Sequence, residues 1–309
     1  RDLHSFPTRR SSDLDGEWDP VHTGSESLGF AIGRSGTMTR YLEGSLNYNR
    51  LFAEKHRVGA LLLYNQKIHT NTQAGSGDAA LPYKNQGLAG RVTYAFKDTY
   101  FAEVNVGYNG SENFARGHRF GFFPAAAIGW MMSNEKWFEP ITNTVDMLKL
   151  KASYGKVGND NVGTRFPYLY TIADRYKNGD NEIVYGGYDW AQYPSSYSFG
   201  GLGFADVASN GITWEVAEKK DLGVDLALFN DKFTATIDYF DEKRTGIYMV
   251  RNYLPQIVGL NGHNPAANVG AVSSKGFDGH FSYKQRINDV NLTVRGNITY
   301  SKNEVLERD

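Results

Sequence analysis

The chain has 309 residues, a net charge of -1 and 22% charged residues, a balance that excludes both the basic surface of a nucleic-acid-binding protein and an acidic tail. It has no cysteine, which excludes disulfides, thiolate nucleophiles and cysteine-based zinc sites. Its 20 Tyr, 18 Phe and 34 Gly, beside only 9 Pro, favour strands and hairpins over helices. We therefore expect an all-β protein.

The first residues, RDLHSFPTRRSSDL, differ from everything that follows. They are basic and serine-rich, and they lack the apolar centre of a signal peptide. They resemble a translated sequencing adapter or a cloning scar. We exclude residues 1–14 from fold reasoning and treat 15–309 as one structural region.

Strands with two different faces are predicted along the rest of the chain. Around the middle, Leu148, Leu150, Ala152 and Tyr154 alternate with lysines and a serine. A period of two indicates a β-strand, because successive side chains point to opposite faces. We predict about 11 or 12 such strands, of about nine to thirteen residues each. In chain order, clear examples are 88–97, 100–109, 148–154, 222–228, 233–239 and 292–300.

The predicted connections alternate in length. Tight turns are expected at 53–55 and near Asp98, Asn230 and Asn288, whereas long polar links cover 65–86, 157–214 and 243–271. Short turns at one end and long loops at the other are the layout of an outer-membrane barrel. A mean hydropathy of -0.49 is compatible with such a barrel, since only alternate residues need be apolar.

The spacing of aromatic residues gives a length to test. Tyr100 and Tyr108 are eight residues apart on one face, which is about 26 Å along a strand. A tilt of about 40° reduces this to about 20 Å of height, close to the apolar band of a membrane barrel. The alternative is a soluble sandwich that uses tyrosines as cross-strand pairs.

Charged side chains occupy the other face of the predicted strands. They would be costly in a small, filled barrel, so they favour a wide, water-filled lumen and more than eight strands. The candidate lumen-lining residues are Arg91, Glu103, Asn105, Lys149, Lys151, Asp225, Asp238 and Arg295.

Three stretches carry a family resemblance: LKLKASYGKVGNDN at 148–161, ITWEVAEKKDLGVDLALFNDKFTATIDYFDEKRTGI at 212–247 and NVGAVSSKGFDGHFSY at 268–283. They are similar to barrel segments of the SusC/RagA branch of TonB-dependent outer-membrane transporters. The chain departs from the family pattern at 210–212, where Asn-Pro is usual before Leu-Thr-Trp-Glu, and at Ser274, where Asn is usual.

The resemblance implies an antiparallel transmembrane β-barrel in the bacterial outer membrane, with 15–309 forming about half of the 22 strands of such a transporter. The family's plug domain and TonB-contacting segment have no match in these residues. Such a fragment should form a curved, incomplete sheet with two unpaired edges, and should aggregate when expressed alone.

The intact protein is then expected to import oligosaccharides or peptides, with energy from TonB and a SusD-like surface lipoprotein as its partner. Outer-membrane lipid would surround it, and no nucleic acid would bind. Two alternatives stay open: a passive porin-like or structural barrel, and a soluble secreted glycan-binding module.

No catalytic constellation is found, and no enzymatic activity, cofactor or metal is expected. The seven histidines are dispersed and lack the spacing of a zinc site, and there is no Gly-x-Ser-x-Gly elbow or P-loop. Asp238, Asp241 and Glu242 could be read as paired carboxylates. Their neighbours Lys243 and Arg244 favour a solvated, mixed-charge rim instead.

The link 157–214 is the place where binding chemistry is expected. Its aromatic side chains can stack on sugar rings or contact peptides, and nearby polar groups can bind hydroxyls. The same residues could instead pack within the loop or contact a partner lipoprotein. The candidates are Tyr168, Tyr170, Tyr185, Tyr188, Trp190 and Tyr193.

Overall fold

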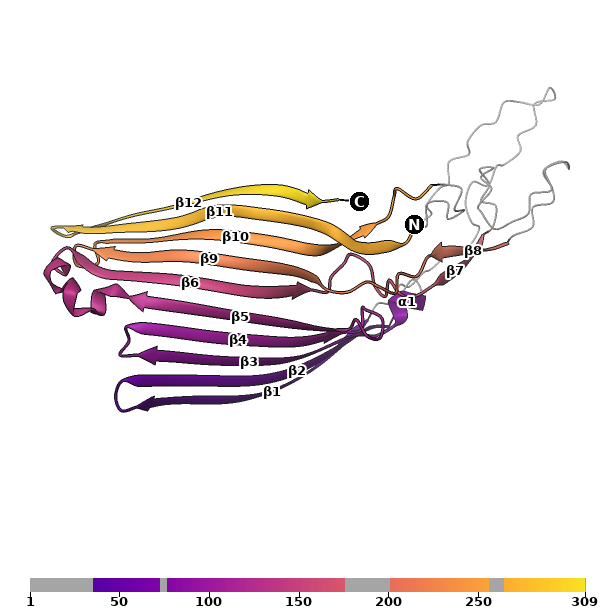
Figure 1. Ribbon diagram of the computed structural model, residues 1–309, viewed down its shortest axis with the longest axis horizontal. Coiled ribbons are helices and arrows are strands. Elements are labelled where there is room, and N and C mark those ends of the chain that lie inside the picture. The colour runs from indigo at the N-terminus through magenta and orange to yellow at the C-terminus, as the bar shows by residue number, and fades with distance from the viewer. Residues whose placement is uncertain (1–35, 73–76, 176–200, 256–263, 309) are drawn as a thin grey trace, which may run out of the picture. The chain divides into compact units, whose positions relative to one another are not determined.

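A computed structural model describes residues 36–72, 77–175, 201–255 and 264–308; the excluded stretch 1–14 lies outside these ranges. Ten antiparallel strands form one open sheet in which chain neighbours are sheet neighbours (Figure 1). The expected all-β, incomplete-barrel architecture is confirmed. The ten strands are β1 (Thr37–Phe52), β2 (His56–Asn71), β3 (Tyr83–Phe96), β4 (Tyr100–Ser111), β5 (Phe120–Met131), β6 (Val145–Asn159), β9 (Glu215–Leu228), β10 (Phe233–Val250), β11 (Ala266–Ile287) and β12 (Val290–Glu307).

The predicted strand count needs a correction. The described residues contain twelve strands, but two of them, β7 (Thr171–Arg175) and β8 (Gly201–Asp206), pair only with each other inside the link between β6 and β9. A short helix, α1 (Gly77–Ala80), lies in the link between β2 and β3. The ten sheet strands have 12 to 22 residues; β4 and β5, with 12 residues each, have the expected length, and the other eight are longer.

The longer strands shorten the predicted links. The links 65–86 and 243–271 shrink to 72–82 and 251–265, and the link 157–214 begins only at 160. Polar residues beyond the apolar stretches continue the ladder, because its hydrogen bonds join backbone groups and do not depend on side-chain polarity. The polar composition of these segments therefore gave the wrong strand ends.

The tight turns form at the predicted places and lie together at one end of the sheet, on the left in Figure 1. Lys97, Asp98, Asn230 and Asn288 adopt positive φ angles between 50° and 55°, as compact hairpin turns require. The link between β5 and β6 at the same end is an exception. It is longer and contains two 3-10 helices, Met132–Asn134 and Lys136–Ile141.

That longer link is attached to the sheet through one carboxylate. Glu135 accepts hydrogen bonds from the Tyr100 hydroxyl at 2.6 Å and from Trp130 Nε1 at 3.1 Å. These bonds favour the ionised form and hold the pKa of Glu135 below its usual value. Tyr100 and Trp130 are directly paired in the β4–β5 register, so the two rings form part of an aromatic row at the turn end.

The register separates an apolar face from a polar face across the whole sheet. One continuous row runs Ile128, Ala152, Leu222, Tyr239, Phe277 and Tyr300, each paired with the next. On the other face, Lys149 pairs with Asp225 and Asp225 pairs with Thr236. Because side chains alternate strictly, the same register that aligns apolar groups on one face aligns charged groups on the other.

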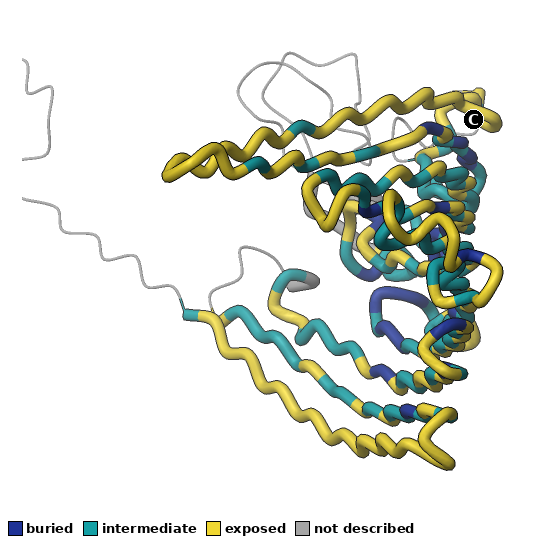
Figure 2. The backbone as a smooth tube through the Cα atoms, turned by 90° about the vertical axis from the view of Figure 1, so that its left-hand side faces the viewer, coloured by how far each residue is buried: buried dark blue, intermediate teal, exposed yellow. Residues whose placement is uncertain are grey.

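The apolar face lies open. Ile128, Leu222, Ile237 and Ile298 are each 58% to 65% exposed, and yellow segments recur along the curved sheet in Figure 2. A β-sandwich would bury these side chains beneath a second sheet. Within the described residues no second sheet covers this face, because the only other pairing is the β7–β8 hairpin. The sheet therefore has the surface of a membrane barrel wall.

A small buried core forms at the loop end instead. Phe114, Phe123, Val162, Ile212 and Trp214 are at most 9% exposed and pack together. The Trp214 ring lies 5.5 Å from the Phe114 ring and 5.3 Å from the Phe123 ring, and its Nε1 donates to the Arg119 carbonyl at 3.0 Å. This core joins the ends of several strands where the ladder stops.

This core predicts a difference between two isoleucines. Ile212→Ala should lower the free energy of unfolding by about 2–5 kcal/mol, because it leaves a cavity beside Trp214. Ile141→Ala is the matched control: Ile141 is 46% exposed, and its loss should cost within about 0.5 kcal/mol. Urea unfolding of the full-length protein in detergent measures both values. Equal losses would contradict the assignment of a loop-end core.

Candidate functional site

The polar face carries all eight candidate lumen residues. Neighbouring strands pair Arg91 with Asn105, Lys149 with Asp225 and Ser282 with Arg295, and the strict alternation then assigns the others to the same face. The set spans β3 to β12. It comprises Arg91, Glu103, Asn105, Lys149, Lys151, Asp225, Asp238 and Arg295.

Two charge clusters organise this face. In the first, Arg91 contacts Glu103 at 2.6 Å, and Asn105 Nδ2 donates to the other oxygen of that carboxylate at 2.7 Å. In the second, Lys151 Nζ lies 3.1 Å from Asp225 and 2.9 Å from Asp238. The side chains of this second cluster are 21% to 36% exposed, so their charges remain in contact with water. Pairing with partial hydration makes charge tolerable here.

A groove of about 390 Å³ lies between the two clusters. Glu103, Lys149 and Lys151 line it together with Phe101, and Lys149 Nζ lies 5.0 Å from the centre of the Phe101 ring. The volume falls in the range of small-molecule sites, and the lining offers donors, acceptors and one aromatic face. Such a surface can make several weak polar contacts with a passing solute.

The possible carboxylate pair does not form. The register puts Asp241 on the opposite face from Asp238 and Glu242, since it lies one residue from each along β10. Each carboxylate also has its own cation: Asp238 contacts Lys151, Asp241 contacts Lys275 at 3.1 Å, and Glu242 contacts Lys219 and Arg244 at 3.1 Å. These groups are therefore separate ion pairs.

Two further observations concern what the described residues lack. In the ranges that the structure covers, no three His, Asp or Glu side chains are grouped so that they could hold a metal ion. Among the same residues, no helix has the length and apolar character needed to cross a membrane.

The second candidate site is the loop end. Of the six aromatic candidates, Tyr168 donates to the Glu112 carbonyl at 3.2 Å, and Tyr170 is 61% exposed. Tyr168 therefore contacts the loop between β4 and β5. The other four, Tyr185, Tyr188, Trp190 and Tyr193, lie outside the described residues.

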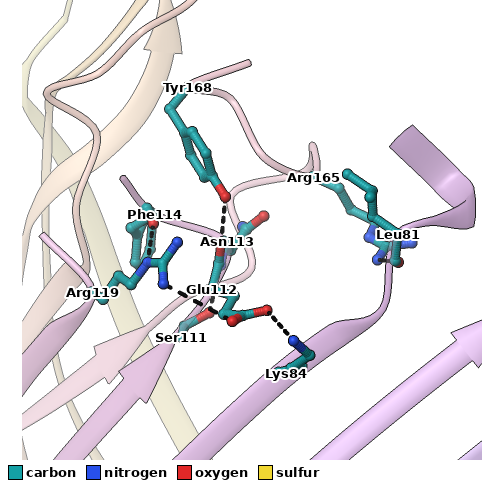
Figure 3. Close-up of polar contacts among 9 residues, drawn as sticks. All are labelled: Leu81, Lys84, Ser111, Glu112, Asn113, Phe114, Arg119, Arg165 and Tyr168. Atoms are coloured by element: carbon teal, nitrogen blue, oxygen red, sulfur yellow. Dashed lines mark hydrogen bonds and ion pairs between the residues drawn. The ribbon is translucent and has the colours of Figure 1, made fainter. Parts of the chain in front are cut away.

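One buried amide fixes the loop that leads to these aromatics. Asn113 is 2% exposed; its Nδ2 donates to the carbonyls of Asp160 at 2.9 Å and Thr164 at 3.3 Å, while its Oδ1 accepts the Phe166 N–H at 2.8 Å. Figure 3 shows Asn113 between Phe114 and Glu112, close to Tyr168. A single side chain thus satisfies three backbone groups in the part of the link that precedes β7.

Two more residues tie the same loop to β3 and its preceding link. Arg165 donates to the carbonyls of Ala79 at 3.2 Å and Leu81 at 2.6 Å. The Asp160 carboxylate accepts hydrogen bonds from the Tyr83 hydroxyl and, at 2.8 Å, from Asn85 Nδ2. The base of the loop is therefore built from three distant segments.

Residues in two of the recognised stretches complete this base. Glu215, which is 7% exposed, accepts hydrogen bonds from the Tyr248 N–H at 3.1 Å and from Asn159 Nδ2 at 3.0 Å. Asn268 accepts the Thr213 N–H at 2.8 Å and donates to the carbonyls of Thr213 at 3.0 Å and Gly246 at 2.6 Å. These side chains hold the loop ends of β6, β9, β10 and β11 together.

Sequence reasoning missed Asn113, Arg165, Glu215 and Asn268 as individual residues. An isolated polar residue in a polar link gives no periodic signal. Glu215 lies in the stretch 212–247 and Asn268 in the stretch 268–283, two of the stretches that carry the family resemblance. That resemblance was the only feature of the sequence that pointed to these two residues.

Comparison with known proteins extends these findings. Residues 4–309 match the family described as TonB dependent receptor-like, beta-barrel. The chain is 24% identical to TonB-dependent receptor P3 of Formosa agariphila, over 86% of the chain and 25% of that protein. It is 25% identical to TonB-dependent receptor SusC of Bacteroides thetaiotaomicron, over 70% of the chain and 20% of that protein. The chain spans about a quarter of the length of these curated relatives.

Solved structures share the fold. The RagAB peptide importer in its closed-closed state superposes with a TM-score of 0.70 at 18% identity, over 89% of this chain and 31% of that chain. The siderophore receptor PirA from Pseudomonas aeruginosa gives 0.55 at 14% identity, over 88% and 44% respectively. The resemblance inferred from three short stretches is thereby confirmed. The open sheet with one apolar and one charged face, matched over almost its whole length, belongs to the TonB-dependent receptor β-barrel family.

Proposed function

We propose that this chain is part of the barrel wall of an outer-membrane transporter that imports oligosaccharides or peptides. TonB supplies the energy, through a region outside this chain, and a SusD-like surface lipoprotein delivers the cargo. The observation that carries the proposal is the two-faced sheet: apolar side chains more than half exposed on one face and paired, hydrated charges on the other. A relative named SusC and the fold of a peptide importer support it.

In this proposal the polar face lines the path of the cargo. Ion pairs that remain partly hydrated can exchange hydrogen bonds with a polar solute at small cost, because each contact replaces one with water. The groove lined by Lys149 and Lys151 is one place along that path where the cargo can bind. The barrel binds and guides, and breaks no bond.

The loop base has a separate role. It holds the start of the aromatic link, so that its tyrosines and tryptophan meet the cargo or the lipoprotein at the mouth of the barrel. Asn113 and Arg165 restrict this segment on the membrane-distal side of β4 and β6. A fixed base lowers the entropy lost when the aromatic residues engage a ligand.

Energy-dependent uptake is the first test. Cells that express the full-length gene product should accumulate a labelled oligosaccharide or peptide, and either a protonophore or deletion of the host tonB gene should lower the uptake rate by about tenfold or more, to the level of cells lacking the gene. Uptake that continues unchanged without the proton gradient would identify a passive porin instead. A product secreted in soluble form would identify the glycan-binding module.

Cysteine labelling tests which face meets water. The native chain has no cysteine, so Asn105→Cys and its strand neighbour Val104→Cys differ only in the face they occupy. A membrane-impermeant thiol reagent should modify Asn105→Cys about tenfold faster, because the reactive thiolate forms only in contact with water. Lys149→Cys and Leu150→Cys repeat the comparison on β6. Equal rates at both neighbours would refute a lipid-facing apolar face.

Limited proteolysis tests the loop base. Asn113→Ala removes the partner of three backbone groups and should destabilise this segment by about 1–3 kcal/mol. Trypsin should then cleave after Arg165 faster than in the parent protein. Asn161→Ala is the control, because Asn161 is exposed and bonds only within its own turn. Unchanged cleavage in Asn113→Ala would show that the loop is fixed by other contacts.

A further inference from the structure

The apolar face changes character abruptly toward the loop end. Its last aromatic row on β10, β11 and β12 is Tyr239, Phe277 and Tyr300, with the Phe277 and Tyr300 rings stacked 5.7 Å apart. Two residues further along each strand, on the same face, stand Asp241, Lys275 and Lys302. Charged side chains therefore continue the apolar face directly beyond the aromatic row.

The register gathers these charges into one patch, which we call the lysine band. Lys220 pairs with Asp241, Asp241 with Lys275, and Lys275 with Lys302; in the next row, Lys156 pairs with Glu218 and Glu218 with Lys243. The second row continues from Lys243 to Ser273 and ends at Glu304 on β12. The band has five lysines against three carboxylates. Its members are Lys156, Glu218, Lys220, Asp241, Lys243, Lys275, Lys302 and Glu304.

The carboxylates of the band leave positive charge uncompensated. Lys156 contacts Glu218 at 2.8 Å and Lys275 contacts Asp241 at 3.1 Å. Lys220, Lys243 and Lys302 are exposed, and among the described residues no carboxylate forms an ion pair with any of them. These three ammonium groups point from the same face as the aromatic row. They can therefore reach anions that lie beside the sheet at this height.

A groove over β2 to β5 repeats the pattern at the same end of the face. It has a volume of about 190 Å³ and includes Lys84, Glu112 and Arg119 in its lining. Glu112 lies 3.5 Å from Lys84 and 3.9 Å from Arg119, so one carboxylate is shared by two cations (Figure 3). The surplus of positive charge thus recurs on a second part of the sheet.

We propose that the lysine band binds the phosphate groups of anionic lipid headgroups in the membrane leaflet nearest the loops. The inference rests on the proposed membrane position of the sheet. An apolar face bordered by aromatic rings lies against acyl chains, and the layer just beyond the rings is the headgroup layer. Lysines in that layer attract anionic lipids. A lipid is the fitting occupant because the cations adjoin an apolar surface that extends without interruption.

Native mass spectrometry of the full-length protein in detergent tests the proposal. The probes are dimyristoyl phosphatidylglycerol, which is anionic, and dimyristoyl phosphatidylcholine, which has the same acyl chains and no net charge. The unmodified protein should retain more of the anionic lipid at equal concentrations, and excess inorganic phosphate should not displace it. Each lysine near the headgroups contributes about fivefold in affinity.

Two triple variants distinguish an effect of the lysine band from an effect of the protein's net charge. Lys220→Gln, Lys243→Gln and Lys302→Gln together should abolish the preference for the anionic lipid. Lys219→Gln, Lys284→Gln and Arg286→Gln remove the same number of positive charges from the polar face, and should preserve it. Equal loss in both triples, or no preference in the unmodified protein, overturns the lipid site. A protein that retains neither lipid and needs no detergent would instead refute the membrane position itself.

Discussion

The requirement that every backbone hydrogen bond be made within the sheet governs this structure. A strand in a lipid environment has no water to pair with, so N–H and C=O groups must find partners on neighbouring strands. The ten strands, each of 12 residues or more, meet this need through antiparallel ladders with their neighbours in the sheet. Once the ladder is set, side chains alternate between faces, and a slip of one residue would exchange the apolar and charged faces of a strand.

At the two ends of the sheet, where the ladder stops, other contacts must satisfy the backbone. At the turn end, compact hairpins with positive φ angles close the strands directly, and at the loop end side chains take over the role of the ladder. Asn113 bonds three backbone groups at the start of the link that follows β6, whereas Glu215 and Asn268 each bond two separate segments. A five-residue core packs beside them. Most of the buried side chains among the described residues lie here, where several loops and strand ends pack together. This base holds residues 160–168, the start of the link that follows β6.

The two faces of the same strands carry different kinds of side chain. On the polar face, charges form small clusters that stay in water, so they gain modestly from pairing and pay little for desolvation. On the apolar face, charge is absent through the middle of the strands and returns beyond the aromatic row as the lysine band. A strand such as β9 therefore carries Asp225 and Lys219 toward one environment and Val224 and Lys220 toward another.

The amino-acid sequence alone determined the class of the fold, the two faces of each strand and the tight turns, because period-two alternation and turn residues act over a few neighbours. The family followed separately, from the resemblance of three stretches to barrel segments of SusC/RagA-type transporters. Sequence reasoning misjudged the strand ends and the number of strands in the sheet, since backbone pairing continues into polar segments and leaves no compositional mark. Only the tertiary structure decided which charges pair across strands, and that Asn113 and Asn268 join distant loops. The charge pairs depend on strand register, and the contacts of Asn113 and Asn268 join chain segments separated by 22 to 55 residues, which no local pattern encodes.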